Sequence, residues 1–140
     1  MTRKASAIWE GDLKSGKGSI SSESGVLKNT QYSFSTRFED GVGTNPEELI
    51  AAAHAGCFSM ALSAELGKAG MTPQKIETTA TLTMDKTDAG PTVTEIHLST
   101  TATIPGADRG KFEAAANTAK AGCPISRLLK TQITMDAKLA

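Results

Sequence analysis

The chain of 140 residues carries 15 lysine and arginine side chains against 15 aspartate and glutamate side chains, and only 4% of its residues are aromatic. This balance excludes a basic surface that would grip nucleic acid or an anionic membrane, and so few aromatic residues exclude a base-stacking platform. The length is that of one ordinary domain, so we expect residues 1–140 to form a single domain.

The first third of the chain predicts short strands. Residues 5–10, 16–22 and 32–37 mix apolar and polar side chains, and the last segment alternates as a half-buried strand does. Residues 1–6 lead into a polar segment, with no apolar stretch long enough for a signal peptide or a membrane span. We therefore expect a cytoplasmic protein with no membrane partner.

A long helix is predicted from Glu47 to about Gly67. Asn45 offers a capping side chain, Pro46 suits the first helical position, and acidic residues fill the first turn. The body of the segment is rich in alanine, leucine and methionine. Gly67 and Gly70 then end the helix.

The second half of the chain predicts a hairpin, two further helices and a last strand. Apolar residues fall on even positions in residues 76–85 and 96–104, which indicates a half-buried antiparallel hairpin turned at residues 88–91. The remaining elements are a helix over about residues 108–121, a short helix over residues 124–129 and a strand over residues 133–139. This order favours an α+β fold, with helices packed on one face of antiparallel sheet.

Two cysteines occur, and in a reducing cytoplasm such a pair is typical of catalysis or metal binding rather than of a permanent disulfide. Cys57 lies in the long helix among small residues, which leave room for a small molecule to approach its sulfur. Cys123 directly precedes Pro124, at the cap of the short helix, where free backbone N–H groups favour a thiolate. Simple packing as small buried side chains is the alternative interpretation.

Two charged residues could support a thiolate. Arg37 closes a predicted strand just before a glycine-containing loop, and Glu47 opens the helix that carries Cys57. An arginine beside a thiol favours its charged form, whereas a carboxylate disfavours it, so Glu47 would instead hold the Arg37 guanidinium in a planar geometry. A surface ion pair for Arg37 and a helix-capping role for Glu47 are the alternatives.

The two histidines allow less specific interpretations. His54 and Cys57 have helical i, i+3 spacing and could form half of a zinc site or a Cys–His acyl-transfer centre, but no further ligand spacing or orienting residue supports either. We therefore expect no metal ion. His97 falls between apolar positions of a strand, which predicts that its side chain faces solvent.

Several segments resemble the OsmC/Ohr family of peroxide-reducing enzymes. They are residues 9–18, residues 37–39, residues 43–49 with 53–63, and residues 119–124. The resemblance extends over essentially the whole chain, and the sequence His54-Ala55-Gly56-Cys57 is similar to the OsmC branch rather than the Ohr branch. It implies an OsmC-like fold, with antiparallel sheets wrapped around central helices in an intertwined homodimer and active sites at the subunit interface.

The resemblance also implies a role for each site residue. Cys57 matches the cysteine that attacks the peroxide, Cys123 matches the resolving cysteine, and Arg37 and Glu47 match the pair that supports the thiolate. The implied enzyme is a cysteine peroxidase of oxidative and osmotic stress defence that prefers organic hydroperoxides to hydrogen peroxide. It binds no cofactor and takes electrons from an external dithiol such as dihydrolipoamide.

We expect Cys57 to form a sulfenic acid and then a disulfide with Cys123, which the dithiol reduces. The rival interpretation is a non-catalytic dimer, with a structural stress-response role or an apolar ligand, in which the cysteines only pack.

Overall fold

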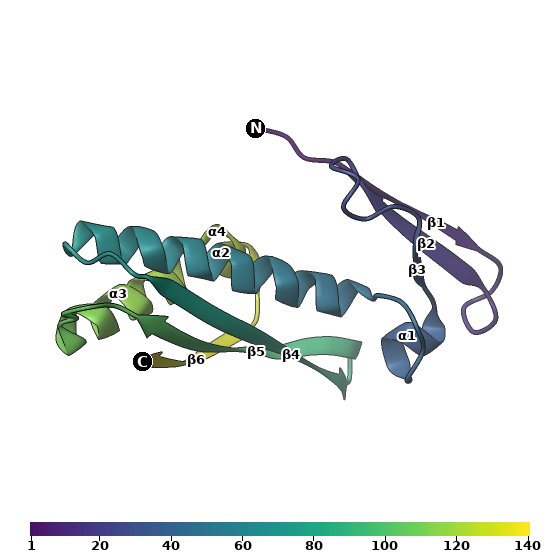
Figure 1. Cartoon of the computed structure of the whole chain (residues 1–140). Coiled ribbons are helices and arrows are strands. Elements are labelled where there is room, and N and C mark those ends of the chain that lie inside the picture. Colours follow the sequence, from purple (N-terminus) through teal and green to yellow (C-terminus); the bar gives the residue numbers. More distant parts are fainter. The chain divides into compact units, whose positions relative to one another are not determined.

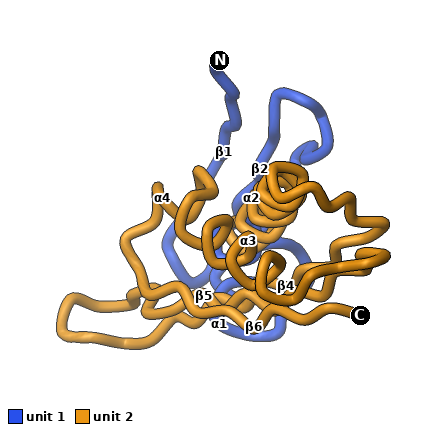
Figure 2. Tube along the Cα trace, turned by 90° about the vertical axis from the view of Figure 1, so that its left-hand side faces the viewer, with its two compact units in different colours: residues 1–49 blue, residues 50–140 orange.

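The computed structural model describes residues 1–140, which divide into two compact units. Residues 1–49 form the first unit and residues 50–140 the second; Figure 2 colours them separately. Whether the whole chain behaves as the predicted single domain stays a prediction.

The first unit is a small antiparallel sheet followed by a short helix. Strands β1 (Ala5–Glu10), β2 (Lys17–Ser22) and β3 (Thr30–Tyr32) pair in chain order, and α1 (Phe34–Phe38) follows β3. All six residues of β1 are exposed, and Thr36 and Thr44 are the only buried residues of this unit. The unit therefore has almost no core of its own.

The strand predicted over residues 32–37 is wrong beyond Tyr32. Ser33 caps a helix instead: its Oγ accepts a hydrogen bond from the Thr36 backbone, and the Thr36 hydroxyl accepts one from the Ser33 backbone. This reciprocal pair satisfies two backbone N–H groups at once. The short alternating run suggested a strand, but the local capping contacts decided the conformation.

The second unit contains most of α2 (Pro46–Lys68), which begins in the first unit, and every later element (Figure 1). The bounds of these elements agree with the predicted ones to within two residues, except that β5 begins six residues before the predicted strand. They are β4 (Lys75–Thr87), β5 (Gly90–Thr103), α3 (Arg109–Gly122), α4 (Pro124–Leu128) and β6 (Gln132–Leu139).

The sheet of the second unit has the strand order β4-β5-β6. β4 and β5 form the predicted antiparallel hairpin, in which Leu82 pairs with Ile96. β5 and β6 pair in parallel, with Ile96 beside Ile133, and so differ from an all-antiparallel arrangement. The connection explains this direction. In the sequence, α3 and α4 come between β5 and β6 and return the chain to the end of the sheet where β5 begins, as a parallel pair requires.

A single apolar core lies between the helices and one face of this sheet. Phe58, Leu62 and Leu66 recur every four residues on α2 and are fully buried against Ile96 and Leu98 of β5. Phe112 and the buried alanines of α3 belong to the same core, consistent with the two helices over the strands in Figure 2. The predicted α+β class is confirmed.

α2 is apolar enough and long enough to cross a membrane by length and composition alone. The core helix of a soluble protein can satisfy the same criteria. Phe58, Leu62 and Leu66 of α2 pack against the sheet and α3.

Candidate active site

The two cysteines come from different elements of the second unit. Cys57 lies on α2 and is partly exposed, whereas Cys123 is buried between α3 and α4. Cys123 ends α3 and caps α4, where its sulfur accepts a hydrogen bond from the Ser126 backbone at 3.3 Å. The predicted cap position of Cys123 is confirmed. Both side chains are free thiols in this structure.

The Cys57 thiol lies beside Cys123. Burial is the largest cause that raises the pKa of Cys57, and the neighbouring Cys123 thiol raises it further. The backbone N–H of Ile125, at the start of α4, acts in the opposite direction by favouring the thiolate. Since burial wins, Cys57 within this unit needs an additional positive charge to be a thiolate at neutral pH.

Arg37 and Glu47 form an ion pair in the first unit. Both Nε and Nη2 of Arg37 approach Oε1 of Glu47, at 2.8 and 2.6 Å. Oε2 of Glu47 is buried and has no hydrogen-bond partner. The pair is therefore made through one carboxylate oxygen, and the second oxygen is unused.

The start of α2 is tied to α1, which brings these two charges together. Asn45 accepts a hydrogen bond from the Glu48 backbone at 2.7 Å and donates one to the Thr36 carbonyl at 2.9 Å. Gly43, with φ of +136°, precedes this segment, and a Cβ there would collide with the Gln31 carbonyl. The loop thus needs glycine at that position.

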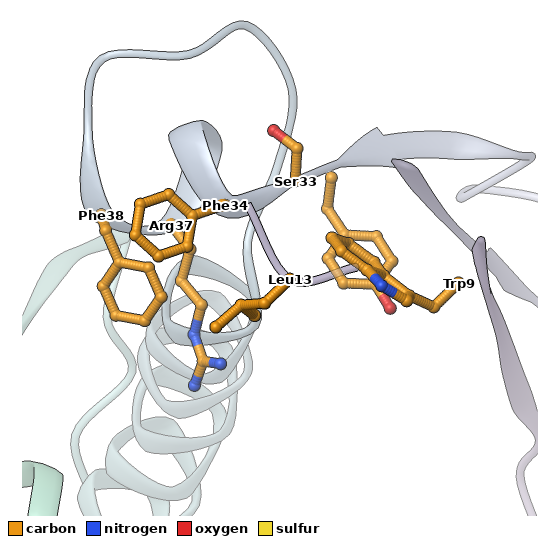
Figure 3. Close-up of a pocket in the computed structure, with 7 residues that line it drawn as sticks. Trp9, Leu13, Ser33, Phe34, Arg37 and Phe38 are labelled. Atoms are coloured by element: carbon orange, nitrogen blue, oxygen red, sulfur yellow. The ribbon is translucent and has the colours of Figure 1, made fainter. Parts of the chain in front are cut away.

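An apolar pocket of about 270 Å³ in the first unit lies against Arg37. Figure 3 shows the guanidinium reaching past the rings of Phe34 and Phe38, with Leu13 and Trp9 on the far side. The guanidinium carbon is 5.2 Å from the centre of the Phe38 ring. The pocket therefore combines an apolar lining with one cationic group.

His54 is fully buried and its Nε2 lies 2.7 Å from the Ser126 hydroxyl. The zinc half-site considered for His54 and Cys57 gains no support, because no group of three or more potential ligands is arranged to hold a metal. His97 is partly exposed on the sheet face opposite Ile96 and contacts Thr134 and Asp136.

Sequence reasoning missed two features of the site. The sequence does not mark Ser126 as a site residue. A serine in a five-residue helix follows no periodic pattern, and its partner His54 is 72 positions away. The aromatic pocket does not follow from the sequence, because the alternating pattern places Phe34 in a strand and Phe38 beyond its end. Their spacing of four residues fits one turn of helix.

Sequence comparison identifies the family. The profile described as OsmC-like protein matches residues 38–138, which is most of the chain. The chain belongs to the OsmC-like family. It is 56% identical over 137 residues to Peroxiredoxin OsmC of Escherichia coli strain K12, a match that covers 98% of this chain and 96% of the relative. It is 32% identical to Organic hydroperoxide resistance protein OhrB of Bacillus subtilis strain 168, over 87% of each.

Solved structures of OsmC-like proteins share the fold. A Vibrio cholerae OsmC-like protein of unknown function superposes with a TM-score of 0.78 at 16% identity, covering 98% of this chain and 99% of the other. The B. subtilis OhrB crystal structure gives 0.67 at 24% identity, covering 98% of both chains. The predicted OsmC-like fold is thereby confirmed.

This OsmC-like protein is a peroxidase, as its identity to the E. coli peroxiredoxin over nearly the full length of both chains indicates. A peroxide-reducing redox function is accordingly its general activity. The rival interpretation of a non-catalytic dimer is not favoured.

Proposed function

We propose that this enzyme reduces organic hydroperoxides to alcohols through a Cys57 sulfenic acid and a Cys57–Cys123 disulfide. The observation that carries the proposal is the placement of two free thiols side by side, one partly exposed and one buried. The exposed thiol can meet a peroxide, and the buried thiol is protected from it.

Each step balances. The Cys57 thiolate attacks the terminal peroxide oxygen, the O–O bond breaks, and the alkoxide takes a proton and leaves as an alcohol. The Cys123 sulfur then attacks the Cys57 sulfenic sulfur, and hydroxide leaves as water with the Cys123 proton. An external dithiol, for which dihydrolipoamide is a suitable chemical type, reduces the disulfide by thiol exchange.

Arg37 would supply the charge that the Cys57 thiolate needs. Burial and the Cys123 thiol raise the pKa of Cys57, so a guanidinium close to the sulfur would favour ionisation. Glu47 would fix the direction of that guanidinium, as its contacts with Nε and Nη2 suggest. The charge and the orientation are thus assigned to two different residues.

The organic group of the substrate would occupy the pocket next to Arg37. Its lining is mostly aromatic and aliphatic, contributed by Trp9, Leu13, Tyr32, Phe34 and Phe38. Such a lining suits an alkyl or aryl group better than hydrogen peroxide, which has no apolar part. The name of the B. subtilis relative, an organic hydroperoxide resistance protein, agrees with this preference.

A homodimer would supply Arg37 and Glu47 from one chain to Cys57 of the other. Glu47 and Cys57 are ten residues apart on the continuous helix α2, about 15 Å along its axis, which no glutamate side chain spans. Two α2 helices crossing antiparallel near Ala52 would bring these residues level. The small exposed residues Ala52, Ala53 and Gly56 would allow the close approach.

The environment proposed for the enzyme is the cytoplasm, under oxidative and osmotic stress. Reduced thiols are the normal state there, and a dithiol reductant is available to close the cycle.

Thiol titration tests the proposed chemistry. One equivalent of cumene hydroperoxide should remove two thiols per chain rapidly, whereas hydrogen peroxide should act more slowly. Peptide mapping should then find a disulfide between Cys57 and Cys123 of one chain. The Cys123→Ser variant should react once and accumulate sulfenic or sulfinic acid at Cys57. Loss of no thiols, or normal dithiol turnover by Cys123→Ser, would contradict the mechanism.

A further inference from the structure

Three buried side chains, His54, Ser126 and Cys123, form a chain of polar contacts that ends at one of the two thiols. His54 occupies the same row of α2 as Phe58 and Leu62, where an apolar residue would be expected, and none of its surface is exposed. Burying an imidazole without hydrogen bonds costs free energy of folding, so the contacts of His54 show what offsets that cost. Its one hydrogen-bonded nitrogen, Nε2, lies 2.7 Å from Ser126 Oγ.

Ser126 links this imidazole to Cys123. The Ser126 hydroxyl lies 3.1 Å from Cys123 Sγ, and its backbone N–H donates to the same sulfur at 3.3 Å. Ser126 and Cys123 are both buried, so no bulk water competes for these contacts. The hydroxyl has a single proton and can rotate freely unless a second partner fixes it, and His54 is that partner.

Burial lowers the pKa of His54, so the imidazole is neutral at neutral pH and offers one donor and one acceptor. The three side chains can consequently be hydrogen-bonded in either direction. With Cys123 as a thiol, S–H donates to Ser126 Oγ and the hydroxyl donates to His54 Nε2. With a thiolate, Nε2–H donates to Ser126 and the hydroxyl donates to the sulfur.

We propose that His54 is a positioning residue that acts through Ser126 on Cys123 and sets the rate at which Cys123 closes the disulfide. His54 fixes the Ser126 hydroxyl, and the hydroxyl holds and polarises the Cys123 sulfur for attack on the oxidised Cys57. The proton of Cys123 leaves with the displaced group, which is hydroxide in the peroxidase cycle. The inference deepens the proposed function and rests on Cys123 being the resolving thiol.

Stepwise kinetics test the assignment. His54→Phe and Ser126→Ala should form the Cys57 sulfenic acid at a rate within about twofold of wild type but close the disulfide about tenfold more slowly, the size expected for one lost hydrogen bond. The double variant should be no slower than the slower single variant, because both changes interrupt one chain of contacts. His54→Gln, whose amide can reach the position of Nε2, should restore most of the rate.

A second measurement follows the same attack without peroxide. Dipyridyl disulfide caps Cys57 and releases one thiopyridone, and Cys123 then displaces a second as it closes the disulfide. The second release should be slowed about tenfold in His54→Phe and Ser126→Ala, as for the sulfenic acid. Unchanged closing in both assays, or equal slowing of sulfenic acid formation and closing, would overturn the role of His54.

The two assays also separate this inference from the proposed function. If dipyridyl disulfide gives the slowed second release but cumene hydroperoxide forms no sulfenic acid, the peroxidase mechanism falls and the His54 assignment stands. If sulfenic acid forms normally and the variants do not slow disulfide closing, the His54 assignment falls and the peroxidase mechanism stands.

Discussion

At the scale of single residues, the buried imidazole of His54 makes one contribution to how the protein responds to acid. Its neighbours along α2 are apolar and its only hydrogen bond goes to Ser126, so nothing in its surroundings stabilises a positive charge. Burial accordingly lowers its pKa below the ordinary 6.5. In the unfolded chain the same side chain is free to take up a proton.

This difference predicts a loss of stability in mild acid. Below pH about 6.5 the unfolded chain binds a proton at His54 and the folded chain does not, so the free energy of unfolding falls as the pH decreases, by at most about 1.4 kcal/mol per pH unit. The loss should stop once the pH is below the lowered pKa. His54→Gln does not titrate and should lack this component in urea denaturation.

His97→Gln is the matched control, because it removes a partly exposed histidine and leaves His54 in place. It should keep the acid dependence that His54→Gln loses. Parallel curves of unfolding free energy against pH for wild type and His54→Gln would contradict the prediction.

The residues differ in how far sequence could locate them. Cys123 was placed correctly at a helix cap because a cysteine directly before proline carries a local signal. Glu47 was also placed correctly at the start of α2, because Asn45 and Pro46 before it are a local signal for a helix start. The contact of His54 with Ser126 was not predicted, because it depends on the packing of α4 beside α2 and no local pattern encodes it.

At the scale of elements, the short helix α1 decides where Arg37 lies. Arg37 is in its last turn, and the helix of five residues is held at its start by the capping contacts between Ser33 and Thr36. A helix this short is not stable by itself, so its caps and packing carry its stability. The orientation of the guanidinium therefore depends on a serine four residues earlier.

Removal of this cap should be measurable. Ser33→Ala should lower the free energy of unfolding by about 0.5–2 kcal/mol, the usual cost of a lost helix cap. It should also lower peroxidase activity, because Arg37 loses its fixed position. Ser6→Ala, at an exposed position of β1, is the control and should change stability by less than about 0.5 kcal/mol. Equal effects of the two substitutions would argue against the role of the cap.

Element by element, the long periodic segments were predictable, and the short alternating run over residues 32–37 was misleading. α2 and the β4–β5 hairpin follow from apolar periodicity over many residues, and the structure confirms them. Residues 32–37 offered six positions of alternation, too few to outweigh two capping hydrogen bonds. The parallel pairing of β6 was also out of reach, because strand direction depends on how α3 and α4 return the chain.

At the scale of the whole molecule, the first unit exposes several of its apolar side chains. Ile8, Leu13, Val26 and Val42 have between 58 and 88% of their surface accessible. A covering partner, if one binds here, would remove this apolar surface from water. A second copy of the chain, as proposed for the active site, would cover these apolar side chains. It would also receive Arg37 and Glu47 of this chain beside its own Cys57.

A mixed dimer tests this arrangement. Cys57→Ser and Glu47→Gln chains should be co-expressed and the heterodimer isolated. If Glu47 serves Cys57 of the other chain, one of the two sites keeps both native residues, and activity should recover to roughly half that of wild type. If Glu47 serves its own chain, both sites lack one residue, and the mixed dimer should be no more active than either parent.

The parallel pairing of β6 has a consequence for the order of folding. The β4–β5 hairpin joins segments that are adjacent in the chain, whereas β6 pairs with β5 across the residues of α3 and α4. Contacts between distant segments form late, since closing a long loop costs entropy before any contact rewards it. Cys123 lies inside this loop. Both thiols also precede β6 in the chain, and their contact joins distant segments, so we expect the redox pair to be assembled late in folding.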